Sequence, residues 1–180
     1  MSKLTYKFLR ENIEDGSFDC GVESINQYVV DSFWATLLQH GYAYQIIYGK
    51  IVVGYYMITF NHIQIEDCPE IISEYTSGIS NFLYSVEIKY IAIDKKYQRK
   101  KIGTSILPSI IKSIKDCALE FPVRLITIDA RNDLIEWYKS FGFIELPHNP
   151  EWQNGYTTKM YIDCMIRKKE FQEYLGTLYE

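Results

Sequence analysis

A run of basic residues beside a helix-starting glycine is the part of the sequence best suited to chemistry. Five of the seven residues from 95 to 101 are Lys or Arg, and Gly103 follows them. The first turn of a helix has backbone N–H groups without internal partners, and the helix dipole adds positive potential there. A glycine lets a phosphate approach this backbone closely. The pattern predicts a diphosphate-binding turn, with a merely solvated charge run as the alternative.

Other common ligand sites are not supported by the sequence. It contains no GxGxxG after a strand and no GxxxxGK[ST], so a dinucleotide fold and a P-loop are not indicated. The four cysteines form no CxxC pair and the three histidines are isolated. We therefore expect reduced thiols and no metal site.

A second group of candidate side chains lies between residues 129 and 143. Asn132 follows a buried, strand-like run, and Tyr138 lies in a short helical stretch that Gly142 can end in the left-handed conformation. Taken alone, Tyr138 is most simply an ordinary aromatic residue of an amphipathic helix. Its chemical interest depends on the basic turn upstream.

The elements that must position these residues alternate between helix and strand, which favours a mixed sheet flanked by helices. We expect helices over residues 21–39, 103–118 and 133–140. We expect strands over residues 44–48, 51–60, 86–93, 123–129, 143–146 and 156–166.

Several residues mark where these elements begin, turn or end. Asp19 is a candidate N-cap of the first helix, and Gly41 is its expected end. Gly49 and Lys50 predict a hairpin. Pro108 predicts a distortion within the second helix. Residues 73–82 are expected to form a loop or short helix, and residues 171–178 show an amphipathic helical stripe.

Length and composition are those of one globular domain. The chain has 180 residues, of which 47% are hydrophobic and 23% charged. No stretch approaches the ~18 apolar residues of a membrane span. The charged start lacks a signal-peptide pattern, so we expect a cytoplasmic protein that does not bind membranes.

Charge is unevenly distributed along the chain. The formal net charge is −4, and outside residues 95–101 there are 14 basic against 23 acidic side chains. A compact positive loop on an acidic body favours a local anionic ligand over a long polyanion.

Residues 98–103 resemble the Gln/Arg-x-x-Gly-x-Gly/Ala signature of the GNAT superfamily of acetyltransferases, with Lys101 in place of the first glycine. The later family signature, a strand leading to Asn and then a helix bearing Tyr before a Gly-Phe turn, is similar to residues 129–143. The resemblance implies an α/β (mixed α+β) fold, with a central, mixed, mostly antiparallel twisted sheet and helices on both faces. It implies a single acetyltransferase domain over residues 1–180, with a helical tail over residues 168–180.

The resemblance also implies roles for individual residues, with acetyl-coenzyme A as co-substrate and no metal. Tyr138 would assist the departing thiolate, and Asn132 would make a polar contact to the cofactor arm. Glu87 lies on the strand leading to the cofactor and could remove the proton of the attacking amine, directly or through water, although Glu87 as an ordinary surface or core-edge carboxylate is at least as good an interpretation. The remaining cofactor-binding residues would be Ile91, Ala92 and Ile93 along the pantetheine, and Gln98, Arg99, Lys100, Lys101, Ile102, Gly103, Thr104 and Ser105 around the phosphates.

Further segments are similar to a GNAT branch that includes bacterial toxins acetylating aminoacyl-tRNA: residues 18–21, 25–26 and 53–56. This branch implies tRNA and a small antitoxin as partners and a homodimer as the assembly. The chain offers one basic loop and residues 167–169 rather than a broad basic face, so a small-molecule or protein amine is the first expectation for the acceptor. A catalytically silent module that binds coenzyme A is the remaining alternative.

Overall fold

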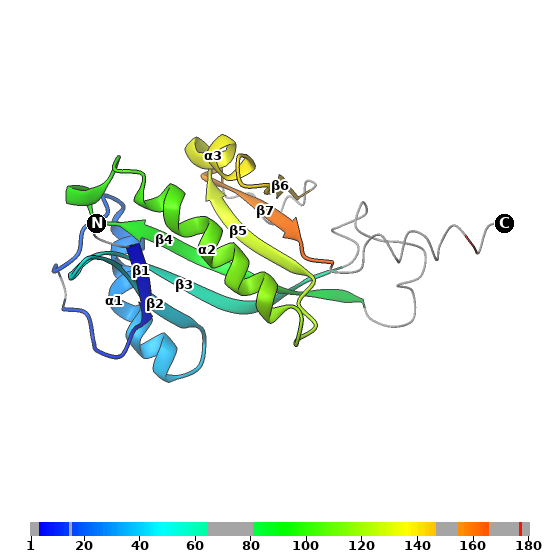
Figure 1. Ribbon diagram of the computed structural model, residues 1–180, viewed down its shortest axis with the longest axis horizontal. Helices are drawn as coiled ribbons and strands as arrows, with labels where there is room; N and C mark the ends of the chain where they lie inside the picture. The colour runs from blue at the N-terminus through cyan, green and yellow to red at the C-terminus, as the bar shows by residue number, and fades with distance from the viewer. Residues whose placement is uncertain (1–3, 15, 65–80, 147–154, 166–176, 178–180) are drawn as a thin grey trace.

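A seven-stranded sheet organises the fold, with strand order β1-β2-β3-β4-β5-β7-β6 (Figure 1). The computed structural model describes residues 4–14, 16–64, 81–146, 155–165 and 177. Neighbouring strands are antiparallel except for β4 and β5. The expected mixed, mostly antiparallel sheet is confirmed. The strands are β1 (Leu4–Phe8), β2 (Tyr42–Tyr48), β3 (Ile51–Gln64), β4 (Phe82–Ile93), β5 (Leu125–Arg131), β6 (Ile144–Glu145) and β7 (Thr157–Asp163).

Two long helices cover opposite faces of this sheet. Helix α1 (Glu23–Leu37) packs on Tyr55 and Met57 of β3, which belong to one core cluster. Helix α2 (Ile102–Cys117) packs on Tyr56 of the same strand, in a second cluster. Because successive strand residues point to opposite faces, the two helices lie on opposite sides, as expected. The short elements η2 (Lys95–Tyr97), η3 (Asn132–Leu134) and α3 (Ile135–Lys139) complete the described chain.

The ends of α1 differ from the sequence prediction. Val22 is the N-cap, and no side chain caps the helix. Asp19 instead accepts hydrogen bonds from the Gly21 amide (2.7 Å) and the Asn26 side chain (3.2 Å). At the other end the positive φ belongs to Gln39 (58°), not to Gly41. The amphipathic pattern located the helix correctly but not the residues that end it.

The other turn predictions fare better. Gly49 has a φ of 67° between β2 and β3, as a tight hairpin requires. Gly142 has a φ of 89° after α3, and its amide donates to the Lys139 carbonyl at 2.9 Å. The distortion expected at Pro108 does not interrupt α2, which is one continuous helix from Ile102 to Cys117, and the proline side chain is exposed.

Some predictions need correction or lie beyond the described chain. Strand β1 was not expected, and the predicted helix over residues 133–140 is divided into η3 and α3. The predicted loop or short helix at residues 73–82 lies outside the described residues, except that residues 81–82 lead into β4. The tail stripe at residues 171–178 also lies outside them, apart from residue 177. Among the described helices, none has the length and hydropathy to cross a membrane.

Candidate active site

The basic turn between β4 and α2 forms a hollow of about 260 Å³. Lys101 is the N-cap of α2 in the left-handed conformation (φ 60°, ψ 17°), with no side-chain cap, and Arg99 also has a positive φ of 58°. Lys101 therefore adopts the backbone angle that a glycine would supply at this position. The lining residues are Ile93, Tyr97, Gln98, Arg99, Lys101, Ile102, Gly103, Thr104 and Trp137.

The first turn of α2 offers its amides to this hollow. The Ser105 N–H is the first that donates within the helix, to the Lys101 carbonyl at 3.0 Å. The amides of residues 102–104 come before it and have no intrahelical acceptor. A Cβ added to Gly103 would come 3.5 Å from the Trp137 ring, an ordinary van der Waals contact. The protein alone therefore does not require glycine here, whereas a closely bound phosphate would.

Trp137 is a lining residue that the sequence analysis did not single out. Its indole N–H donates to Thr104 Oγ1 at 3.4 Å, which joins α3 to the first turn of α2. Its ring also packs edge-on against Tyr138 at 4.7 Å between centroids. A signal was present in the sequence, since Trp137 directly precedes the candidate Tyr138.

Gln98 lines the hollow, but its side-chain amide is hydrogen-bonded to the protein. Its side-chain amide donates to the carbonyl of Cys20 at 2.7 Å and to that of Ile93 at 2.9 Å. Lys95 pairs with Asp19 at 2.8 Å, and its own amide donates to the Asp19 carbonyl. We call these contacts of Asp19, Cys20, Lys95 and Gln98 the latch. It fixes the basic turn to the segment before α1.

The latch changes which basic groups face the hollow. Lys95 is paired with Asp19, and the hydrogen bonds from Lys95, Gly21 and Asn26, with that of Lys95 the largest contribution, lower the pKa of Asp19 to about 2. Lys100 donates to the Lys96 carbonyl at 3.0 Å and lies 5.2 Å from the centre of the Tyr97 ring. Arg99 and Lys101 are the two basic residues that line the hollow.

Strand β4 provides an open backbone edge beside the hollow. Ile91, Ala92 and Ile93 pair with β3 on one side. On the other side the pairing of β4 with β5 ends at Glu87 and Thr127. Beyond that point the two strands diverge, so the β5-facing edge of residues 88–93 has no strand partner among the described residues. This edge can accept an extended chain of amide groups in the manner of an added strand.

Tyr138 is 5% exposed and packs edge-on against Phe143 at 5.6 Å. Burial raises its pKa above the ordinary value for tyrosine. The hydroxyl therefore stays protonated at neutral pH and can act as a hydrogen-bond donor.

Asn132 is committed to contacts within the protein. Its side-chain N–H donates to the Gly155 carbonyl at 3.2 Å, and its oxygen accepts from Thr158 at 3.0 Å. Its backbone amide donates to the Tyr156 carbonyl. Asn132 thus fixes η3 to the start of β7, and its cofactor contact stays a prediction.

Glu87 is 4% exposed and lies at the point where β4 and β5 diverge. One carboxylate oxygen, Oε2, accepts from the Asn61 amide at 3.2 Å. The other, Oε1, lies 3.8 Å from the ammonium of Lys159 and 3.9 Å from that of Lys89. A buried carboxylate between cations is suited to proton transfer or to a structural ion pair.

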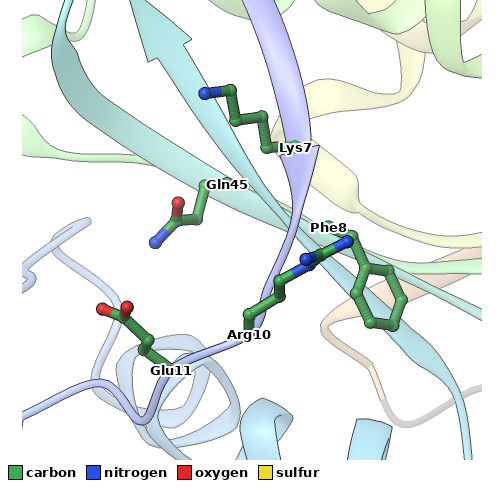
Figure 2. A pocket seen from close by; sticks show the side chains of 5 residues that line it. All are labelled: Lys7, Phe8, Arg10, Glu11 and Gln45. Atoms are coloured by element: carbon green, nitrogen blue, oxygen red, sulfur yellow. The ribbon is translucent and has the colours of Figure 1, made fainter.

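A larger hollow of about 520 Å³ opens beside β1 (Figure 2). It is lined by Lys7, Phe8, Arg10, Glu11 and Gln45. By strand register, Lys7 is opposite Gln45, Gln45 is opposite Tyr55, and Tyr55 is opposite Ala92. The hollow therefore lies at β1 and β2, three and two strands from β4, and none of the predicted site residues lines it.

The mixed sheet thus diverges between β4 and β5 beside the uncapped start of α2. An acetyltransferase (GNAT) domain model matches residues 73–163, just over half of the chain. The chain therefore belongs to the GNAT acetyltransferase family, and it is an N-acetyltransferase. A comparison with curated proteins gave no match.

Solved structures share the fold over the whole chain. A bacterial toxin aligns with a TM-score of 0.77 and 17% identity, over 100% of this chain and 97% of that one. AtaT in complex with acetyl-methionyl-tRNAfMet aligns with a TM-score of 0.72 and 17% identity, over 99% and 100%. A mutant of the toxin AtaT, bound to the C-terminus of the antitoxin AtaR and to acetyl-CoA, aligns with a TM-score of 0.67 and 19% identity, over 90% and 94%. The resemblance to toxin-type GNAT proteins is confirmed at the level of the fold.

Proposed function

We propose that this chain transfers the acetyl group of acetyl-CoA directly to a primary amine. The observation that carries the proposal is the juxtaposition of two features. The uncapped start of α2 with its left-handed Lys101 can hold the pyrophosphate, and the adjoining open edge of β4 can hold the pantetheine. A solved structure of an AtaT mutant with the same fold contains bound acetyl-CoA, which supports this choice of ligand.

The cofactor contacts follow from this arrangement. The amides of Ile102, Gly103 and Thr104 donate to phosphate oxygens, and Arg99 and Lys101 add charge. Backbone groups of residues 91–93 pair with the pantetheine amides, and one of those N–H groups can polarise the thioester carbonyl. Gln98, held by the latch, positions the turn rather than contacting the phosphates by itself.

The reaction is a direct displacement at the thioester. The neutral amine attacks the acetyl carbonyl carbon, a C–N bond forms, and the C–S bond breaks. Glu87 accepts the proton that the amine nitrogen loses, directly or through water. Tyr138 donates a hydrogen bond to the departing thiolate. Complete protonation of a thiolate of pKa ~8.5 by a phenol of pKa ~10 is uphill by roughly 2 kcal/mol, and burial of Tyr138 increases that cost.

Acetyl-CoA binding is tested by calorimetry with the intact protein. We expect saturable binding of both acetyl-CoA and coenzyme A. The comparison variant is Lys101→Pro, which should bind acetyl-CoA more weakly. A proline cannot adopt a φ of 60°, so this substitution removes both the left-handed cap and a charge. Absence of any binding by the folded wild-type protein would contradict the proposed function.

Aminoacyl-tRNA is the second candidate acceptor. The whole-chain similarity to AtaT solved with acetyl-methionyl-tRNAfMet favours it, and the AtaR complex supports a small antitoxin as partner. Incubation with [¹⁴C]acetyl-CoA and a full set of charged tRNAs, in parallel with small amines and peptides, identifies the acceptor. Label on tRNA that is lost when the aminoacyl ester is hydrolysed supports tRNA. Label only on small amines or peptides excludes it.

A further inference from the structure

A row of polar side chains crosses the α1 face of the sheet where β4 and β5 diverge. Val86 and Ile88 belong to the core cluster under α2, so Glu87 between them points to the opposite face. By the same alternation Asp129 of β5 and Lys159 of β7 also point to that face, and they are register partners. Charged groups from three strands therefore meet beside the open edge of β4.

The two oxygens of Glu87 have different surroundings. Oε2 accepts from Asn61 at 3.2 Å and, more weakly, from Thr59 at 3.5 Å. Oε1 lies 3.8 Å from Lys159 Nζ and 3.9 Å from Lys89 Nζ, both beyond hydrogen-bond length. Within the described part of the chain, Oε1 has cations nearby and no direct donor. It is the oxygen free to accept a proton.

Lys159 is the better shielded of these two cations. Its side chain is 12% exposed, whereas that of Lys89 is 39% exposed. Its direct hydrogen bond goes to Asp129 Oδ1 at 3.0 Å. Because water screens a shielded charge less than an exposed one, Lys159 has the stronger electrostatic interaction with the buried Glu87 carboxylate.

Two buried hydroxyls show that the interior beside Glu87 is polar rather than apolar. Thr127 of β5 is paired in register with Glu87 of β4, and Ser85 precedes Glu87 by two residues on β4. Both are fully buried, and neither hydroxyl has a hydrogen-bond partner in the described structure. Unsatisfied buried groups of this kind are typical of places where water or a ligand completes the hydrogen bonding.

We propose that Lys159 is a positioning residue for acetyl transfer. Anchored by Asp129, its ammonium holds the Glu87 carboxylate in place, with Oε1 left to take the proton that the acceptor amine loses. The proposal rests on the proposed function, because it assigns a use to Glu87 in that reaction. Lys159 itself does not contact the cofactor or take up a proton.

The test measures acetyl transfer by Lys159→Met, by Lys159→Arg and by the matched surface control Lys112→Met on α2. The acceptor is the one that becomes labelled in the assay with [¹⁴C]acetyl-CoA. A misplaced general base should lower kcat/KM in Lys159→Met by about tenfold, while acetyl-CoA affinity is unchanged. The charged groups described around Glu87 are Lys89, Lys159 and, through Lys159, Asp129. Lys159→Arg should restore most of the rate, and Lys112→Met should match the wild type.

An unfolding cycle separates this proposal from the proposed function. Lys159→Met should lower the thermal midpoint at pH 7 by about 3 °C or more, because it leaves a buried carboxylate without its shielded cation. Adding Glu87→Gln should recover at least half of that loss. If the two substitutions are additive, Lys159 does not act on Glu87, whether or not transfer is observed. If they are coupled but kcat/KM of Lys159→Met is unchanged, the pair is structural and the positioning role is wrong.

Discussion

Tyr138 combines a buried hydroxyl with a ring that belongs to the core, and the two properties can be separated by experiment. The Phe substitution keeps the edge-on contacts with Trp137 and Phe143 and removes only the hydroxyl. We expect Tyr138→Phe to lower turnover by tenfold or more, since a hydrogen bond to a developing thiolate is lost. Acetyl-CoA affinity by calorimetry should remain within about twofold of the wild type. Unchanged turnover would remove Tyr138 from the mechanism.

The raised pKa of Tyr138 also has a consequence for pH dependence. The donor is the protonated phenol, which is lost only as pH rises through the pKa of the folded state. Because burial places that pKa above the ordinary value of ~10, Tyr138 should cause no decline in turnover below about pH 10. The check is a pH–rate profile of the wild type against Tyr138→Phe. A decline on the alkaline side that disappears in the variant would contradict this assignment.

A substitution at Gly103 should change cofactor binding without destabilising the fold. An added Cβ would make an ordinary contact with Trp137, and Ala favours a helix over Gly by about 0.5–1 kcal/mol, so Gly103→Ala should not destabilise the protein. If phosphate approaches the backbone here, the same methyl group should raise the Kd for acetyl-CoA by about tenfold, a loss of one good hydrogen bond. Calorimetry and thermal unfolding measure the two effects. Unchanged affinity would mean that the pyrophosphate lies elsewhere.

At the scale of elements, periodicity and turn chemistry were enough to place the parts that form the site. The amphipathic stripe located α2, and Gly142 ended α3 as its conformational freedom predicts. The same reasoning missed β1, because a five-residue edge strand of alternating polarity close to the chain start has no turn signal before it. It also assigned Asp19 to a helix cap, because an N-cap is the commonest use of Asp before a helix.

The latch could not be predicted from local sequence. Asp19 and Lys95 are 76 residues apart in the chain, and their contact depends on how α1 and β4 pack together. Gln98 shows the same limit: its place in the motif predicts a binding role, but only the fold reveals its bonds to two carbonyls. The motif residues were therefore found by pattern, whereas the residues that hold them in place required tertiary structure.

The latch leads to a prediction for Asp19→Asn. The amide can still accept from Gly21 and Asn26, so the start of α1 should be preserved, but the ion pair with Lys95 is lost. A less firmly held turn should bind acetyl-CoA a few-fold more weakly. The matched control is Asp31→Asn on the exposed face of α1, which should have no effect. Equal affinities in all three proteins would show that the turn is rigid without the latch.

Acid sensitivity offers an independent measurement of the latch. Because the pKa of Asp19 is lowered to about 2, its ion pair is fully present above the ordinary carboxyl value of 3.8. The stabilisation is lost as pH falls from 3.8 through 2. The wild type and Asp19→Asn should therefore differ in thermal midpoint at pH 6 and converge toward pH 2. A difference that grows with acid would have the wrong sign for this group.

At the scale of the whole molecule, charge limits how a tRNA acceptor could be held. The chain carries a net charge of −4, and residues 95–101 concentrate five cations at the start of α2, where the cofactor phosphates are proposed to bind. Lys95 is already paired with Asp19. A tRNA acceptor would therefore be held through few phosphate contacts, or through contributions from a second chain.

This reasoning predicts a shallow salt dependence for tRNA acetylation by the isolated chain. If about three phosphates are neutralised, log(kcat/KM) for the tRNA should fall against log[salt] with a slope of about −2 to −3. Acetyl-CoA is kept saturating so that its own salt dependence does not contribute, and a small neutral amine serves as the control acceptor with a slope near zero. A slope of −5 or steeper would require a broad basic face, which the acidic body of the chain does not supply, and would point to an assembly that brings cations from more than one copy.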